Sequence, residues 1–170
     1  MAEGHARAPR PEPVKVSIGE FHVAGPGHRL AIHGLGSCVA ILLHDPAARL
    51  SGLGHFLLPH PPRGRGDLPR SRFVSTGVPD LVEALRHRGA QPSRLVAKLA
   101  GAAQMFRYEA GNDDDGIGAR NLETAVRVLR ELQIRLLGQD TGGSYGRTIL
   151  VDAATGRMEI RAVRIEERIL

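Results

Sequence analysis

The stretch Gly34-Leu35-Gly36-Ser37-Cys38-Val39-Ala40-Ile41-Leu42-Leu43 decides how this chain is organised. Two glycines and a serine precede Cys38, the only cysteine, and Val39 to Leu43 is a continuous apolar run. Such a run is typical of a strand that is buried on both faces. Glycines permit tight turns and leave room beside main-chain N–H groups. The stretch therefore predicts a glycine-rich turn that presents Cys38 at the start of a buried strand.

The residues that follow predict a β-hairpin. Asp45 to Ala48 is a turn signal, and Leu50 to Leu58 then has the composition of a returning strand. Cys38 would lie at the start of the first strand and His55 within the second, so pairing would bring the two side chains within hydrogen-bonding distance. The proline- and glycine-rich stretch from Pro59 to Arg70 predicts a loop directly after His55.

The rest of the chain predicts further strands and two helices. One helix is expected from Pro79 to Arg88, with Pro79 as its first residue and Gly89 as its C-cap, and a second from Ala119 to Leu132. Strand patterns cover residues 14–18, 30–32, 95–99 and 134–137, and a C-terminal hairpin covers 148–151 and 158–163. This irregular order predicts an α+β fold, or a mixed sheet with helices on one side.

Composition indicates one globular domain. The chain has 170 residues, of which 42% are hydrophobic and 24% are charged. We expect residues 1–12 to form a disordered tail and 13–170 to form the domain. A single cysteine cannot form an internal disulfide, and the N-terminus lacks the apolar core of a signal peptide. No apolar run is long enough to insert into a membrane. These features predict a cytoplasmic protein.

The net charge of +5 comes almost entirely from arginine. Attraction to an acidic partner and a genome-wide arginine bias both explain such a charge. Nucleic acid is disfavoured as a partner, because the basic residues are not interleaved with aromatic ones and no helix-turn-helix or zinc pattern is present.

Cys38 and His55 each have two interpretations. A neighbouring imidazole lowers the pKa of a thiol and produces the reactive thiolate. On composition alone, however, a lone buried cysteine or histidine is more often a residue of the apolar core. A zinc site is a third interpretation, because His33, His44 and His60 lie nearby in the sequence. It is disfavoured by the absence of a CxxC, HxH or HExxH spacing.

Several motifs, in order along the chain, resemble the CheD family of chemoreceptor glutamine deamidases. They are GLGSCVA at 34–40, DP at 45–46, GHFLLP at 54–59, KLAGAAQMF at 98–106, IGARN at 117–121 and DTGG at 140–143. The resemblance extends over residues 14–163. It implies a layered α/β sandwich, a mixed β-sheet with helices packed on it, in the group of cysteine hydrolases related to cytotoxic necrotizing factor deamidases.

The resemblance also implies a function. It is the hydrolytic deamidation of particular glutamines in methyl-accepting chemotaxis receptors, with Cys38 as the nucleophile and His55 as its base. Backbone N–H groups around Gly36 and Ser37 would stabilise the oxyanion. This chemistry requires no metal and no organic cofactor. A CheC-type CheY-phosphate phosphatase is a further implied partner. The alternative is a catalytically weak binding module that engages such a phosphatase or the receptor.

One position departs from the family pattern. The third member of the family's catalytic triad is a threonine, and Ile32 occupies that position here. An isoleucine side chain cannot accept a hydrogen bond, so either a backbone carbonyl or another side chain, such as that of Asn121, would have to orient His55. His33 is expected to face the opposite side of its strand. Phe106 is interpreted either as an exposed partner-binding aromatic or as a core residue.

Overall fold

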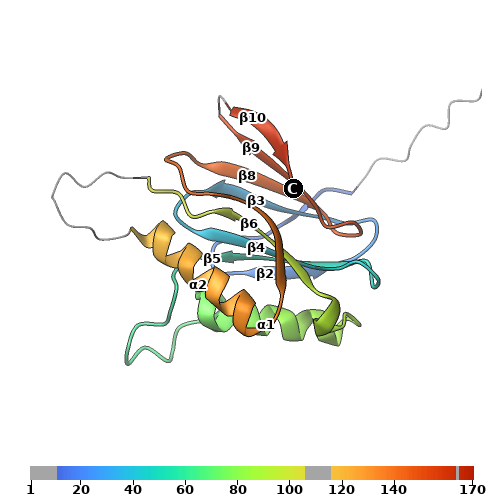
Figure 1. Ribbon diagram of the computed structural model, residues 1–170, viewed down its shortest axis with the longest axis horizontal. Helices are drawn as coiled ribbons and strands as arrows, with labels where there is room; N and C mark the ends of the chain where they lie inside the picture. Colours follow the sequence, from blue (N-terminus) through green and yellow to red (C-terminus); the bar gives the residue numbers. More distant parts are fainter. Residues whose placement is uncertain (1–10, 106–115, 164) are drawn as a thin grey trace, which may run out of the picture.

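Two five-stranded sheets and two helices make up the fold (Figure 1). The computed structural model describes residues 11–105, 116–163 and 165–170. The first sheet contains, in spatial order, β1 (Val14–Lys15), β3 (Arg29–Leu35), β8 (Arg147–Asp152), β9 (Arg157–Ala162) and β10 (Ile165–Ile169). The second contains β2 (Phe21–Ala24), β5 (Leu50–Phe56), β4 (Val39–Asp45), β6 (Val96–Gly101) and β7 (Arg135–Thr141). The helices are α1 (Val74–His87) and α2 (Ile117–Glu131).

The elements stack in three layers, with the second sheet in the middle. An apolar cluster of residues from β3, β8 and β9 on one side and β4, β5 and β6 on the other joins the two sheets. A second cluster joins β4, β5 and β6 to α1 and α2, which cover the other face of the middle sheet (Figure 1). The predicted α+β class and layered arrangement are confirmed. The structure differs from the prediction of a single mixed sheet, because it has two sheets, each with one parallel strand pair (β1–β3 and β6–β7).

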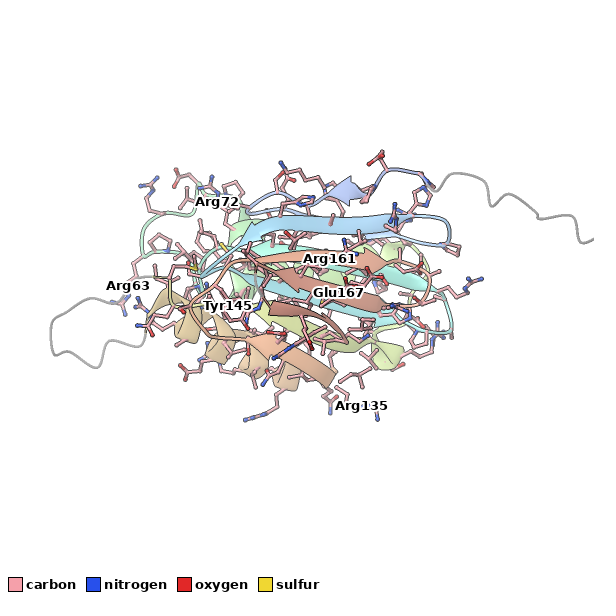
Figure 2. The ribbon with its side chains drawn as sticks, turned by 90° about the horizontal axis from the view of Figure 1, so that it is seen from above. Arg63, Arg72, Arg135, Tyr145, Arg161 and Glu167 are labelled. Atoms are coloured by element: carbon pink, nitrogen blue, oxygen red, sulfur yellow. The ribbon has the colours of Figure 1, made fainter. Side chains whose placement is uncertain are left out.

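The outer face of the first sheet is polar. Figure 2 looks onto this sheet and shows Arg161 of β9 beside Glu167 of β10, whose charged atoms are 3.0 Å apart. Apolar side chains of the same strands point inward, and Ile149 of β8 and Ile160 of β9 lie in the cluster between the sheets. This alternation is the period-two pattern of a sheet that faces solvent on one side.

β4 occupies the centre of the middle sheet, between β5 and β6. All seven of its residues are buried. Val39 and Ile41 pack toward the helices, whereas Ala40 and Leu42 pack toward the first sheet. Because successive side chains point to opposite faces, a strand between two apolar layers needs an unbroken apolar run. The predicted hairpin is confirmed, since β4 and β5 pair in antiparallel register from Val39↔Phe56 to Asp45↔Leu50.

The start of α1 differs from the prediction. The sequence placed Pro79 at the first helical position, whereas the helix begins at Val74 and contains Pro79. The N–H of Gly77 already donates to the carbonyl of Phe73 at 2.7 Å, so helical pairing is established before the proline. Near a helix start, a proline removes only one backbone donor, which the packing of α1 tolerates. The end was predicted correctly: Gly89 follows the helix with a φ of 102°, which suits a glycine C-cap.

The other predicted elements are present with shifted ends. α2 and the strands predicted at 30–32, 95–99 and 134–137 appear as α2, β3, β6 and β7, and the C-terminal hairpin as β8 and β9. β1 is shorter than predicted, and β2 and β10 were not predicted. In the described part of the chain, neither helix has the length and apolar character required to cross a membrane.

Candidate active site

Cys38 lies immediately before β4 and is 7% exposed. The segment that carries it is held by three successive carbonyl oxygens. In residues 36–38 these oxygens accept hydrogen bonds, in order, from the N–H of Ala103 at 3.0 Å, the side-chain amide of Asn121 at 3.0 Å and the N–H of Ala102 at 2.7 Å. The main chain on either side of the thiol is therefore fixed by residues that come much later in the sequence.

The N–H groups of the same segment have a different status from its carbonyl groups. Among the residues that the structure describes, the N–H groups of Gly36, Ser37 and Cys38 donate no hydrogen bond to another residue. Unused N–H groups beside a nucleophile are what an oxyanion hole requires. Use of these groups by a substrate remains a prediction, but the predicted residues Gly36 and Ser37 do lie next to the thiol with their donors free of internal partners.

His55 lies in β5 and is 2% exposed. The register pairs it with Ala40, and Cys38 precedes Ala40 by two residues. Side chains two residues apart share a face, so Cys38 lies one diagonal step from His55 on the side that faces the first sheet. The hairpin places the two side chains on one face, where the sequence predicted that they would lie within hydrogen-bonding distance. No hydrogen bond joins them, however: within the described ranges, the buried Nε2 of His55 has no partner.

The other ring nitrogen of His55 has a partner. Nδ1 lies 3.4 Å from the carbonyl oxygen of Val16. A carbonyl can only accept, so Nδ1 carries the hydrogen and Nε2 carries the free lone pair. Val16 is buried, and its own N–H donates to the carbonyl of Ala31 at 2.8 Å. This bond to β3 fixes the position of the Val16 carbonyl.

Burial controls the ionisation of both groups. Burial raises the pKa of the Cys38 thiol, although the N–H of the same residue favours the thiolate. Burial lowers the pKa of His55, although the Val16 carbonyl favours the protonated ring. Burial thus favours the neutral thiol and the neutral imidazole in the free protein. The sequence suggested the opposite direction for the thiol, because it could not show how completely the pair is enclosed.

The site does not include Ile32, His33, His44 or His60. Ile32 is fully buried in β3, in the same apolar cluster as Cys38, and His33 beside it is exposed, as strand alternation predicted. His44 is buried at the far end of β4, and His60 is exposed. Over the described ranges, no group of three or more His, Cys, Asp or Glu side chains is placed to hold a metal ion.

Asn121 is fully buried near the start of α2 and makes no hydrogen bond to His55. Its Nδ2 donates to the carbonyls of Ser37 and Leu57, each at 3.0 Å. It is therefore not a side-chain substitute for the family threonine. Sequence reasoning allowed for a backbone carbonyl beside His55 but could not identify Val16 as its source, because a backbone carbonyl leaves no signature in residue type. Phe106 lies outside the described residues.

A cavity of about 400 Å³ opens beside the segment that carries Cys38. It lies between the stretch after β6, the start of α2 and the loop after β7. Its lining residues are Ala102, Gln104, Gly116, Ala119, Leu122, Gly142, Gly143 and Ser144. Ala102 also donates its N–H to the carbonyl of Cys38, so the cavity adjoins the thiol segment.

Comparisons with known proteins agree on one family. Residues 57–162 match CheD, described as CheD chemotactic sensory transduction. A probable chemoreceptor glutamine deamidase CheD of Symbiobacterium thermophilum is 43% identical over 150 residues, covering 87% of this chain and 91% of that protein. A chemoreceptor glutamine deamidase CheD of Halalkalibacterium halodurans is 39% identical over 156 residues, covering 91% and 96%.

A distant likeness to a solved structure was also found. It is the crystal structure of the Bacillus licheniformis hypothetical protein YfiH, with a TM-score of 0.47 and 14% sequence identity. The likeness covers 76% of this chain and 59% of that one.

Proposed function

Because the chain belongs to the CheD family, we propose that it hydrolyses glutamine side chains of methyl-accepting chemotaxis receptors to glutamate and releases ammonia. It would act in the cytoplasm, as a cysteine-dependent hydrolase of chemotactic signal transduction. The observation that supports this most directly is the position of Cys38, the only cysteine, one diagonal step from His55. Its neighbouring N–H groups donate to no other residue in the part of the chain that the structure describes.

The first step is attack by the thiol. Nε2 of His55 has a free lone pair and accepts the proton as Sγ of Cys38 bonds to the carboxamide carbon of the substrate. The π electrons of the carbonyl move to oxygen, and the N–H groups of Ser37 and Cys38 stabilise that negative charge. Since the thiol is neutral before attack, proton transfer accompanies formation of the C–S bond rather than preceding it.

The second and third steps return the proton. The imidazolium of His55 protonates the amide nitrogen, the C–N bond breaks, and ammonia leaves a thioester on Cys38. Water then gives a proton to Nε2 and attacks the thioester carbon. The C–S bond breaks, Sγ recovers the proton, and the product is glutamate. The balance is one water consumed and one ammonia released, with no oxidant, metal or cofactor in the sequence of steps.

We further propose that the Val16 carbonyl orients the imidazole in place of the family threonine. Its contact with Nδ1 holds the ring in the tautomer that leaves Nε2 free, and it stabilises the imidazolium formed during attack. The Ile32 side chain contributes only apolar packing. A main-chain acceptor therefore replaces a side-chain hydroxyl without changing the chemistry of the dyad.

A second candidate function is that of a binding module, which engages a CheC-type phosphatase or the receptor without efficient catalysis. The observation that favours it is the replacement of the family threonine by a fully buried isoleucine. This proposal includes binding of a CheC-type phosphatase, and such binding does not require Cys38 and His55 to be catalytically active.

The test is incubation of the purified protein with the cytoplasmic fragment of a receptor from the same organism, followed by peptide mass spectrometry. We expect specific glutamines to be converted to glutamate, and no conversion by Cys38→Ala. A receptor fragment that binds the protein but is returned unmodified would instead support the binding module. Cys38→Ala is a suitable control, because removal of one sulfur from this apolar setting leaves the surrounding hydrogen bonds to the main chain in place.

A further inference from the structure

Asn121 connects the two segments that carry the dyad. Both of its Nδ2 hydrogens are used, one on the Ser37 carbonyl and one on the Leu57 carbonyl, each at 3.0 Å. Two carbonyl partners fix which end of the amide is nitrogen. Ser37 immediately precedes the nucleophile, and Leu57 follows His55 by two residues. A single, fully buried amide thus reaches both sides of the site.

The sheet itself does not hold these two segments together. The pairing of β4 with β5 ends at Val39↔Phe56, so Ser37 and Leu57 lie beyond the last pair. Where the ladder of main-chain hydrogen bonds stops, Asn121 supplies the cross-link between the chains. Sheet pairing sets the register of Cys38 and His55, and Asn121 adds a side-chain link between the two chains just beyond the last pair.

The amide is held rigidly. At Gly118, in the same helix, an added Cβ would lie 2.6 Å from the carbonyl oxygen of Ala102, so α2 starts in backbone contact with that stretch. Ala102 and Ala103 in turn donate to the carbonyls of Cys38 and Gly36. The start of α2, the stretch after β6 and the nucleophile segment form one connected unit, which fixes the amide before any substrate arrives.

We propose that Asn121 is a positioning residue of the deamidation reaction, acting through the Ser37–Cys38 peptide group. The carbonyl that Asn121 binds and the N–H of Cys38 belong to this same peptide. A hydrogen bond received at the oxygen polarises the peptide and makes its N–H a stronger donor. That N–H is one of the two assigned above to the oxyanion. The effect is therefore greatest when negative charge develops on the substrate, which distinguishes this role from a purely structural one. This inference rests on the proposed function.

The first test is Asn121→Asp, which keeps the shape and removes the donor. We expect kcat to fall by about 10- to 100-fold, somewhat less than for direct loss of an oxyanion donor, with little change in KM. The matched control is Thr124→Val, a change of similar shape at a buried position of the same helix. It should leave kcat near the wild-type value. Equal losses in the two variants, or an unchanged kcat in Asn121→Asp, would overturn the proposal.

A second readout does not depend on turnover. The rate of Cys38 alkylation by iodoacetamide, measured against pH, reports the apparent pKa of the thiol. The carboxylate of Asn121→Asp should raise this apparent pKa by about one unit or more, because a nearby like charge disfavours the thiolate. Thr124→Val should not change it. If the wild type modifies no receptor glutamine while this shift is observed, the proposed function fails and the shift shows only that position 121 influences the ionisation of Cys38. An unshifted profile would refute the positioning role even if the wild type deamidates the receptor.

If circular dichroism and thermal melting show that Asn121→Asp does not fold, Asn121→Gln is measured in its place. The longer side chain keeps the amide but moves it away from the Ser37 carbonyl. A lowered kcat with an unchanged KM and melting temperature supports the role, whereas wild-type kcat in this variant contradicts it.

Discussion

Nη2 of Arg147 lies 2.9 Å from Oδ1 of Asp140, in an ion pair whose side chains are only 1% and 5% exposed. Nε of the same arginine makes a second bond to this oxygen at 3.1 Å. Asp140 belongs to β7 of the middle sheet and Arg147 to β8 of the first, so the pair joins the two sheets. Arg147 is also the register partner of Leu35, in the segment that leads to Cys38. The aspartate of the DTGG motif therefore has a structural explanation.

Removal of one partner of this ion pair should destabilise the fold strongly. We expect Asp140→Ala to lower the free energy of unfolding by about 3–5 kcal/mol, because it leaves a buried guanidinium without its counter-charge. Urea unfolding measures the change. The control is Glu167→Ala, which breaks the exposed pair with Arg161 and should cost about 1 kcal/mol or less. Comparable losses in both variants would show that burial does not set the strength of the Asp140 pair.

Substitution of Gly101 should disturb the site directly. Gly101 has a φ of 94°, and an added Cβ would lie 2.5 Å from the carbonyl oxygen of Cys38. Gly101→Ala should therefore displace the segment that carries Cys38. We expect a large fall in kcat and only a small fall in melting temperature. Gly89→Ala is the matched control, since Gly89 has a φ of 102° and open space around it. Gly89→Ala should lower stability through backbone strain alone. Its kcat in receptor deamidation assays should equal that of the wild type.

The pH dependence of kcat/KM should report the ionisation of His55. The ring must be neutral to accept the thiol proton, and burial lowers its pKa below the ordinary value of 6.5. Activity should therefore persist as the pH falls to 6.5 and decline only below it. An acidic limb centred above 6.5 would contradict the assignment. Melting temperatures measured over the same pH range separate this loss of activity from acid unfolding. Acid unfolding is expected in part because the pKa of the buried His44 is also lowered, so its protonation at low pH favours the unfolded chain.

Restoration of the family residue should not increase activity. If the Val16 carbonyl already orients His55, Ile32→Thr gains no catalytic hydrogen bond. It should lower the free energy of unfolding by about 1–3 kcal/mol, because it buries a hydroxyl in an apolar cluster. Ile32→Val, which removes only a methylene, serves as the control and should cost about 1 kcal/mol. A large rise in kcat with Ile32→Thr alone would show that the natural chain lacks an effective orienting group.

Local patterns predicted the fold well where a strand or helix has one clear environment. The unbroken apolar run of β4 and the helical spacing in α2 each reflect the layer on which that element packs, so both were predicted correctly. β2 and β10 were missed because β2 has only four residues and β10 is mostly charged. The division into two sheets could not be predicted, since it depends on pairings such as β3 with β8, which lie far apart in the sequence.

The candidate site was predictable only in part. Cys38 and His55 have side chains whose chemistry can be recognised from residue type and hairpin pairing. The Val16 carbonyl and the bridge from Asn121 cannot be recognised in that way, because one is main chain and the other depends on where the ladder between β4 and β5 ends. The direction of the thiol pKa shift was also out of reach, because it follows from enclosure by both sheets rather than from neighbouring residues.

The donors that hold the nucleophile segment come from Ala102, Ala103 and Asn121, all of which are synthesised long after Cys38. A nascent chain that ends before α2 contains Ala102 and Ala103 but lacks the Asn121 amide that binds the Ser37 carbonyl. The full set of hydrogen bonds around Cys38 therefore forms only when the later half of the domain docks.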